Sequence, residues 1–437
     1  MVSGKQLARE VFQQTLSSID IPRIMEWKLP LLGTELRLPQ CQVDLAQVAR
    51  ICVVAIGKAA HAMVRGLVQV LPEHVSISGI VAAPTPPPER VGNFEYFVGG
   101  HPIPNAESCK AGEAILRCLQ SADEKTLVFF LLSGGGSALV EMPLASAMDL
   151  RDVQTLHHAL VTCGAPIEPM NTVRRHLSAV KGGRLAVAAG RATKISVAVT
   201  DVPVGKENAL ASGPSLPDPS TIEDTRRILQ QYGLYDRLPR SLVDWLEAGQ
   251  MPETPKSGEP AFANNHFVLL LGMDDLFHAA HHAVEARGYV ACCDNSIDDW
   301  PVQKAADYLL AQLDAWRTEN KGQRVALIAD GELSSPVTGN GIGGRNSAFV
   351  LACVEQIAGS GITVLSAGTD GVDGNSPAAG AVADGETLSR ARSLGLDPRA
   401  ALAQSDAYTF FQKLDDVVMT GPTGNNLRDL RILLAEP

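Results

Sequence analysis

The sequence predicts an α/β protein made of two three-layer α/β/α domains with mainly parallel sheets. Two observations lead to this prediction. Short, continuous apolar runs alternate with segments of helical period along the chain, and 437 residues are too many for a single hydrophobic core. Strands that are buried on both faces and alternate with helices are typical of parallel sheets covered by helices on both sides.

The repeating unit is an apolar strand, a turn containing glycine and an amphipathic helix. In the first example, residues 51–56 form a continuous apolar run, and Ala59, Ala62 and Met63 begin a stripe of helical spacing. Further strands are predicted in the segments 78–84, 126–140, 194–203, 266–288, 324–332, 361–371 and 415–424.

The best candidate for a linker is a stretch rich in proline, glycine and charge between residues 245 and 260. We therefore expect an N-terminal domain over 1–248, a linker over 249–261 and a C-terminal domain over 262–437. A cleft between two such domains is where a small-molecule site is expected.

The overall composition excludes some classes of partner. The net charge is −11, with 48 acidic and 37 basic residues, which argues against a nucleic-acid or anionic-membrane partner. Eight cysteines without a CxxC pair favour reduced thiols, and no apolar run approaches the roughly 18 residues of a membrane span. The sequence predicts a soluble, cytoplasmic protein; its oligomeric state is left open, a homodimer being one alternative.

Two predicted turns follow strands in the first half of the chain. Lys58 comes directly after a strand and Gly57, where its ammonium could reach a phosphate or could equally be an ordinary surface lysine. The second turn holds consecutive glycines between serines, which favours an anion cradle over a tight turn. Its residues are Ser133, Gly134, Gly135, Gly136 and Ser137.

Basic residues gather in the segment 171–186 of this acidic protein. Arg174 and Lys181 are seven residues apart, on one face of a predicted helix that the two glycines after Lys181 should end. They could contact an anionic substrate or form a solvated basic face. Further on, Asp201 stands at a strand end, a position suited to a general base or a metal ligand.

The second half offers a different set of charged residues. Gly339, Gly341 and Gly344 match GxGxxG, but the nearest strand ends about ten residues earlier, so the dinucleotide fingerprint is not supported. Arg345 follows this loop and could bind phosphate bidentately. Asp370 and Asp373 lie in a glycine-rich loop after a strand and suit Mg²⁺.

Eight motifs in order resemble those of the class II glycerate kinases, the glycerate 2-kinase family with a C-terminal MOFRL domain. They are IGKAA, GGHPIPNAES, LLSGGGSAL, NTVRRHLSAVKGGRLA, ASGPS, GGRN, GTDGVDG and TGPTG, spread from about residue 55 to 425. The resemblance implies a Rossmann-like N-terminal domain and a MOFRL-type C-terminal α/β domain. It also implies an interdomain active site, ATP and Mg²⁺ as cosubstrates, and phosphoryl transfer to a glycerate hydroxyl, commonly giving 2-phosphoglycerate.

The resemblance also implies roles for residues. Lys58, Asp201 and Arg345 would form the polar centre of the site, with the 133–137 loop, Gly343 and Gly344 binding phosphate and nucleotide. Arg174 and Lys181 would contact the glycerate carboxylate or the nucleotide phosphates, and Asp370 and Asp373 the metal. The chain departs from the family at Val204, Gly205 and Lys206, where a Gly-Asp pair is usual, and at Ser347 and Ala348, where GGRNQE is usual.

Two other functions stay open at this point. An NAD(P)H-dependent hydroxypyruvate reductase is supported by the GxGxxG match alone. A phosphosugar-binding module without catalysis is the other alternative, because glycine-serine loops after strands also serve that purpose.

Overall fold

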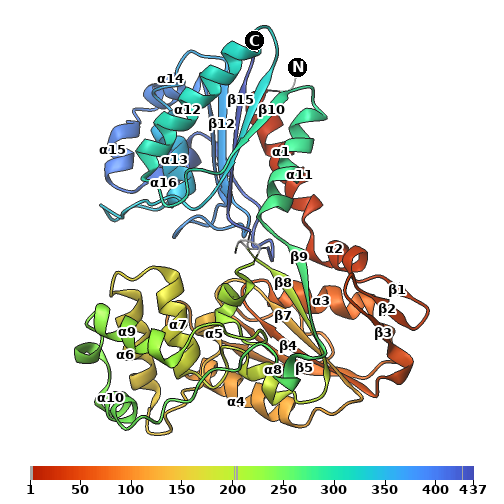
Figure 1. Cartoon of the computed structure of the whole chain (residues 1–437). Helices are drawn as coiled ribbons and strands as arrows, with labels where there is room; N and C mark the ends of the chain where they lie inside the picture. Colours follow the sequence, from red (N-terminus) through yellow and green to blue (C-terminus); the bar gives the residue numbers. More distant parts are fainter. Residues whose placement is uncertain (1–2, 201, 203–204, 426) are drawn as a thin grey trace. The chain divides into compact units, whose positions relative to one another are not determined.

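The computed structural model describes residues 3–200, 202, 205–425 and 427–437, and the chain divides into two compact units (Figure 1). The large unit is Ile21–Leu271. The small unit consists of residues 3–20 and Gly272–Pro437. Each unit has its own six-stranded sheet and its own hydrophobic core.

This division differs from the expected boundaries, because residues 249–261 do not behave as a linker. Met251 and Thr254 of that segment are buried within the large unit. Strand β9 (Asn265–Leu271) then pairs in parallel with β8 (Thr193–Val199) and completes the sheet of the large unit. At the other end, α1 (Gly4–Ser18) contacts strands of the small unit, and Lys5 Nζ lies 2.7 Å from Asp416 Oδ2.

The sheet of the large unit is parallel throughout, in the strand order β6-β5-β4-β7-β8-β9. This confirms the parallel sheet predicted for the first half. The inner strands β4 and β7 are almost entirely apolar and buried on both faces, as in parallel sheets generally, whereas the edge strand β6 is partly exposed. The remaining strands of the sheet are β4 (Arg50–Ile56), β5 (Ile77–Ala83), β6 (Asn93–Val98) and β7 (Thr126–Leu132).

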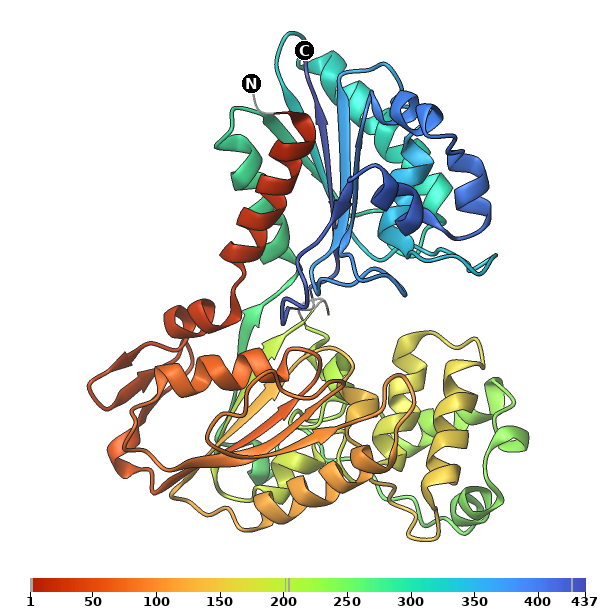
Figure 2. The same ribbon diagram turned by 180° about the vertical axis from the view of Figure 1, so that it is seen from behind.

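Helices cover both faces of this sheet (Figure 2). On one face lie α2 (Ile21–Lys28) and α3 (Ala60–Val70), and on the other α4 (Ala106–Gln120) and α8 (Arg184–Ala188). Alternate residues of the strands point to each face; Val54 and Phe130 belong to the core shared with α4 and α8. A small antiparallel sheet of β1 (Leu31–Leu32), β2 (Glu35–Arg37) and β3 (Gln42–Asp44) precedes β4.

The large unit also holds a helical layer that the sequence analysis does not predict. Four helices share a separate core that includes Leu160, Val173, Leu229 and Leu242. They are α6 (Leu150–Val161), α7 (Ile167–Leu177), α9 (Ile222–Gln231) and α10 (Arg240–Glu247). Shorter helical segments connect the elements: α5 (Gly136–Leu139), η1 (Leu45–Gln47), η2 (Glu207–Ser212), η3 (Tyr235–Arg237) and η4 (Pro260–Phe262).

The sheet of the small unit is mixed, in the order β10-β11-β15-β12-β13-β14. Only β10 and β11 pair in parallel; the other neighbours are antiparallel. The prediction of two α/β domains is confirmed, but the mainly parallel pairing does not extend to this sheet, because the C-terminal strand β15 inserts between β11 and β12. The strands are β10 (Val290–Asp294), β11 (Val325–Asp330), β12 (Ile362–Gly368), β13 (Gly380–Asp384), β14 (Val417–Val418) and β15 (Asp429–Ala435).

Helices again lie on both faces of this second sheet (Figure 1). One face is covered by α1 and α11 (Met273–Glu285), and the other by α12 (Val302–Glu319), α13 (Arg345–Cys353) and α16 (Ala407–Lys413). The remaining helices are α14 (Thr387–Ser393) and α15 (Pro398–Ala403). Among the described residues, no helix is both long and apolar enough to cross a membrane.

Candidate functional site

The two turns predicted at strand ends of the large unit meet each other. Strands β4 and β7 are parallel neighbours, with Ile56 opposite Leu132, so the turns that follow them leave the same edge of the sheet. The Lys58 N–H donates to the Gly134 carbonyl at 3.0 Å, and the Ala59 N–H donates to Ser133 Oγ at 3.0 Å. The backbone itself therefore holds Lys58 beside the glycine turn.

Two glycines of these turns are required by close packing. Gly57 has a φ of +129°, and a Cβ there would lie 2.1 Å from Ser133 Oγ. Gly136 is buried, and a Cβ there would lie 2.6 Å from the Cβ of Ala211. Ser133 is also fully buried, so its hydroxyl connects the two turns rather than facing a ligand. The half-exposed part of the loop is Gly134, Gly135 and Ser137.

Two nitrogen-bearing side chains border this open part of the loop. A Cβ at Gly135 would lie 3.1 Å from His101 Cδ2 and 3.6 Å from Lys58 Cγ, so both side chains border the same glycine. The pKa of His101 is lowered by partial burial and by the positive charges of Lys58 and Arg174. The structure thus places His101, which was not predicted as a site residue, beside Lys58 at the glycine loop.

A chain of hydrogen bonds links the glycine loop to α7. Ser137 Oγ lies 2.8 Å from Ser212 Oγ, and Ser212 Oγ donates to Asn171 Oδ1 at 3.2 Å. The same amide oxygen accepts from Arg174 Nη1 at 3.2 Å. Ser212 has a φ of +61°, a conformation that non-glycine residues rarely adopt and that is enriched at functional sites. Asn171 and Ser212 lie in the quoted motifs but were not singled out.

Lys181 is not a substrate contact in this structure. It is 2% exposed, and its ammonium donates to Glu141 Oε2 at 2.6 Å, the Val140 carbonyl at 3.1 Å and Ser178 Oγ at 3.3 Å. Although burial raises the pKa of Glu141, the Lys181 charge and hydrogen bonds from His157 and Lys181 hold it well below its usual range. The expected helix fails here because α7 ends at Leu177, before Lys181.

Arg174 remains placed for anion binding. Its side chain is largely buried, and Nε has no hydrogen-bond partner among the described residues. Burial lowers the pKa of its guanidinium, whereas the Glu141 carboxylate raises it. Arg174 shares the negative charge of Glu141 with Lys181, which is ion-paired to it. A bound anion would therefore add negative charge beside Arg174.

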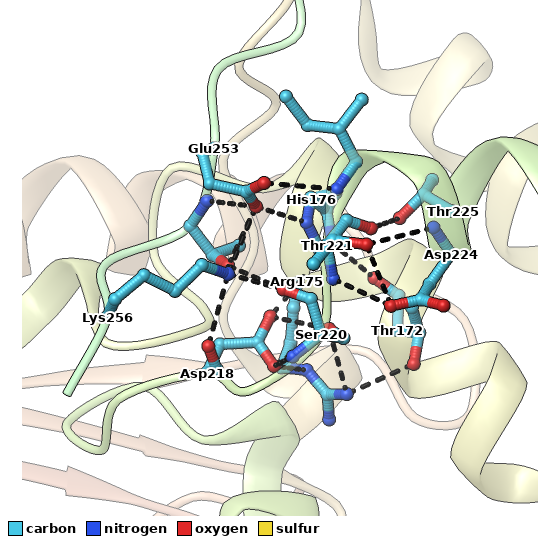
Figure 3. A network of polar contacts seen from close by, with 12 residues as sticks. Thr172, Arg175, His176, Asp218, Ser220, Thr221, Asp224, Thr225, Glu253 and Lys256 are labelled. Atoms are coloured by element: carbon cyan, nitrogen blue, oxygen red, sulfur yellow. Dashed lines mark hydrogen bonds and ion pairs between the residues drawn. The ribbon is translucent and has the colours of Figure 1, made fainter.

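The neighbouring basic residues of this motif have a structural role, shown in Figure 3. Arg175 Nε lies 2.9 Å from Asp218 Oδ1, and His176 Nε2 lies 2.9 Å from Glu253 Oε1. Lys256 Nζ lies 3.0 Å from the same Glu253 oxygen. The His176–Glu253 contact joins residues 249–261 to α7, and Lys256 Nζ donates to the Asp218 carbonyl at 3.1 Å, which is the physical reason that the expected linker belongs to the large unit.

In the small unit, Asp373 caps helix α13 and does not present a free carboxylate. Its Oδ1 accepts from the Asn346 N–H at 2.9 Å, and its Oδ2 accepts from the Ser347 N–H at 2.8 Å and from Ser347 Oγ at 2.6 Å. It is 1% exposed. The Asp373 carboxylate therefore caps the helix, with the unusual Ser347 as one of its donors, and its role as a metal ligand stays a prediction.

The predicted phosphate-binding glycines precede the same helix. The Gly343 N–H donates to Asn375 Oδ1 at 2.8 Å and the Gly344 N–H donates to Ser347 Oγ at 3.2 Å, so both amides already have acceptors. A Cβ at Gly344 would lie 2.4 Å from Asp373 Oδ1. These glycines allow close packing and leave a half-exposed backbone edge, but they do not form a ring of unpaired amides.

Arg345 is held by two carboxylates at the end of the sheet. Its Nε and Nη2 donate to the two oxygens of Asp429 at 2.5 and 3.3 Å, and its Nη1 donates to Glu332 Oε2 at 2.8 Å. Burial lowers the pKa of this guanidinium, but Asp429 and Glu332 raise it above its usual value. The fork that was expected to bind phosphate is thus occupied by Asp429 within the chain.

Two further carboxylates lie at this edge of the sheet. Asp370 follows β12 and is half-exposed; its Oδ1 accepts from the Val372 N–H at 3.1 Å. Asp330 ends β11 and is 1% exposed, and neither of its oxygens has a hydrogen-bond partner among the described residues. Burial raises the pKa of Asp330 to about 6, against the opposing charges of Arg428 and Arg431. The sequence analysis does not single out Asp330, because it ends a strand whose other residues are all apolar.

The GxGxxG match does not form a dinucleotide turn. Gly339, Gly341 and Gly344 lie in the long connection between β11 and α13 rather than in a tight strand-to-helix junction. A Cβ at Gly339 would lie 2.5 Å from the Gln404 carbonyl oxygen, and one at Gly341 would lie 2.4 Å from Asp406 Cβ. These glycines permit packing against the segment between α15 and α16.

Asp201 and Val204 lie outside the described residues. Lys206, the other departure in that loop, is exposed and lies 3.3 Å from Glu168 Oε2. Among the described residues, the only group of three close metal-binding side chains is His281, His282 and Glu285 on α11.

Glycine turns bordered by lysine and histidine at the ends of parallel strands are typical of α/β proteins that bind small anions. Residues 7–247 match the family described as "Domain of unknown function (DUF4147)", and residues 325–429 match the MOFRL family. With these two matches, the chain belongs to the class II glycerate kinase family.

Similar proteins agree over the full length of the chain. The D-glycerate 2-kinase of Thermotoga maritima is 32% identical over 98% of both chains. A solved structure of a glycerate kinase from the same organism has a TM-score of 0.85 and covers 99% of both chains at 32% identity. A protein of Agrobacterium vitis, named only provisionally as a hydroxypyruvate reductase, is 35% identical over 99% of this chain and 95% of its own.

Proposed function

We propose that this protein phosphorylates D-glycerate with ATP, at the 2-hydroxyl, giving 2-phosphoglycerate. The observation that carries the proposal is the full-length similarity to D-glycerate 2-kinase, in a chain whose glycine loop is bordered by Lys58 and hydrogen-bonded through Ser212 and Asn171 to Arg174. Both reactants are anions, so the reaction needs local positive charge in a protein whose net charge is −11.

In the large unit, we assign the 134–137 loop, Lys58 and Arg174 to holding negative charge. Phosphoryl transfer asks the protein mainly for positioning and for stabilisation of charge on the transferred group. The half-exposed glycines let an anion approach the backbone, and the Ser137–Ser212–Asn171 chain fixes Arg174 beside it. A neutral His101 can donate a hydrogen bond without adding a further charge.

Asp201 is proposed to accept the proton of the attacking hydroxyl or to hold the metal, and Arg345 to stabilise phosphate charge. Mg²⁺ would neutralise phosphate oxygens when bound, as in other phosphotransferases. Of the two predicted ligands, Asp370 fits this group because its half-exposed carboxylate is a suitable hard oxygen donor, whereas Asp373 is committed to α13.

A coupled assay of ADP release tests the proposal, with D-glycerate and the longer acid erythronate as acceptors. We expect turnover with D-glycerate, and a lower kcat/KM with erythronate. The kinase assignment would be refuted if neither acid led to ADP release.

A second candidate is an NAD(P)H-dependent hydroxypyruvate reductase, which the name of the Agrobacterium vitis relative favours. The packing roles of Gly339 and Gly341 count against it. Loss of absorbance at 340 nm with NADH or NADPH and hydroxypyruvate would support the reductase; we expect no loss.

A further inference from the structure

The small unit contains a cavity of about 490 Å³ beside the start of α13. Its walls come from the beginning of α12, the connection between β11 and α13, and the end of α15. This volume lies in the range of about 300–1,000 Å³ that is usual for small-molecule sites. Since all of its walls belong to the small unit, the cavity is complete within that unit.

The lining of this cavity is mostly apolar. Val302, Pro336, Val337 and Leu402 provide hydrocarbon surface. Val337 is 81% exposed, which leaves a β-branched apolar side chain in water at the wall of a cavity. Such a surface favours a flat apolar group that would cover the valine.

A few polar groups could fix the orientation of such a ligand. Ser334 and Ser335 line the cavity, and their hydroxyls have no hydrogen-bond partner within the described parts of the chain. A hydroxyl both donates and accepts, so it can pair with ring nitrogens or an exocyclic amine. By contrast, Thr338 already donates its hydroxyl to the Ala403 carbonyl at 2.8 Å.

The charge of the lining argues against glycerate as the occupant. Arg399 is the one lysine or arginine side chain among the described lining residues, and its Nε lies 2.8 Å from Glu355 Oε2 on the surface. A small carboxylate would gain little from apolar walls and from a cation that is already paired. An aromatic base would gain much more.

The cavity also leads to the proposed phosphate-binding stretch. Gly343 and Gly344 line it, and Arg345 follows them directly in the chain. A nucleotide needs an apolar slot for its base next to cations for its phosphates. The cavity provides the slot, and Arg345 is the neighbouring cation, for which the phosphates would compete with Asp429 and Glu332.

We propose that this cavity, the α13–α15 pocket, binds the adenine base of ATP, with the phosphates extending past Gly343 and Gly344 toward Arg345. The assignment deepens the proposed function and rests on it for the identity of the nucleotide. Adenine is also part of NADH, so the experiment must separate these two sources.

A matched pair of variants on α15 tests the pocket. Ala403 is exposed and lines the cavity, whereas Ala400 is exposed on the same helix and is not among the lining residues. In Ala403→Phe the ring should fill part of the cavity and weaken ADP binding at least about tenfold by calorimetry, the equivalent of 1.4 kcal/mol. Ala400→Phe should bind ADP as the wild type does, and the KM for D-glycerate should be unchanged in both.

Photolabelling with 8-azido-ADP, followed by mass spectrometry of peptides, provides a measurement on the unmodified protein. We expect the label in peptides that contain residues 334–344 or 398–407, with protection by ADP and not by NADH. Label confined to other peptides would overturn the proposal, even if Ala403→Phe failed to fold.

The remaining outcomes distinguish a failure of the pocket proposal from a failure of the kinase proposal. If Ala403→Phe weakens ADP binding but the wild type phosphorylates neither acid, the pocket stands and the kinase proposal fails. If the wild type phosphorylates D-glycerate and Ala403→Phe binds ADP normally, the pocket proposal fails alone. Protection by NADH but not by ADP would overturn the assignment to ATP.

Discussion

The two candidate binding regions, one in each unit, differ in how their charges are balanced. In the large unit, Lys58 borders a glycine loop, a chain of hydrogen bonds connects Arg174 to it, and Glu141 is paired with Lys181. In the small unit, Arg345 is paired with both Asp429 and Glu332 at the start of α13.

This difference teaches that a phosphate would meet competing carboxylates at Arg345 of the small unit. In the large unit, the loop offers a half-exposed backbone beside Lys58, and we expect negative charge to be stabilised there. In the small unit, a phosphate must compete with Asp429 for Arg345, or arrive with a cation that neutralises the carboxylates.

The largest expected effect is on stability and comes from Lys181→Met, which should remove the buried ion pair of the large unit. Removal of Lys181 leaves the buried Glu141 charge without its cation, and we expect a loss of about 3–5 kcal/mol in the free energy of unfolding. Urea denaturation measures it. Arg191→Met, which removes an exposed ion pair with Glu124, is the control and should change stability by less than about 1 kcal/mol.

Lys58→Ala should separate catalysis from stability. Loss of one charge contact to the transferring phosphate should lower kcat/KM by about 10²–10³-fold, with an unchanged melting temperature. Steady-state ADP release measures the effect, and Lys125→Ala, at an exposed lysine of the same unit, is the control. Equal activity of the two variants would exclude Lys58 from the site.

Asp330→Asn tests the buried carboxyl of the small unit through the pH dependence of the protein's stability. The native pKa of Asp330 is about 6, above its ordinary value of 3.8, so the folded state binds the proton more tightly than the unfolded state. Stability is therefore lost as the pH rises from 3.8 to about 6, and the variant should be more stable by about 2–3 kcal/mol at pH 7.

Unfolding in urea at pH 4 and pH 7 tests this sign, with the exposed Asp314→Asn as the control. The gain of Asp330→Asn should shrink at pH 4, where the wild-type carboxyl is protonated. A gain that is equal at both pH values would show that Asp330 does not titrate as proposed.

The smallest effect is expected for Ser137→Ala. Its hydroxyl contacts Ser212 at the start of the chain of hydrogen bonds that leads to Arg174, so the loss should be about 0.5–1.5 kcal/mol of transition-state stabilisation. This corresponds to roughly a two- to tenfold lower kcat/KM. An unchanged rate would mean that Arg174 is positioned without Ser137.

Much of the large unit could be predicted from the sequence, because its strands are continuous apolar runs with helical spacing between them. The glycine turn after β7 and Lys58 after β4 follow from the same pattern, since parallel neighbours end at one edge of the sheet. The antiparallel insertion of β15 could not be predicted, because strand order depends on pairing between distant segments.

The site was harder to predict wherever one residue type serves two purposes. Lys181 and Arg174 belong to one basic segment, but only the position of Glu141 decides that Lys181 is buried in an ion pair. Asp373 looks like a metal ligand in sequence and caps α13 in three dimensions. His101 and Ser212 come from distant loops, so no local spacing marks them.

Phosphorus NMR of the product tests the central claim most directly, with the wild type and Lys58→Ala incubated with ATP, Mg²⁺ and D-glycerate. We predict that the wild type produces a resonance of 2-phosphoglycerate and that Lys58→Ala produces almost none in the same time. ATP that stays intact with the wild type, or a product formed equally by both proteins, would contradict the account.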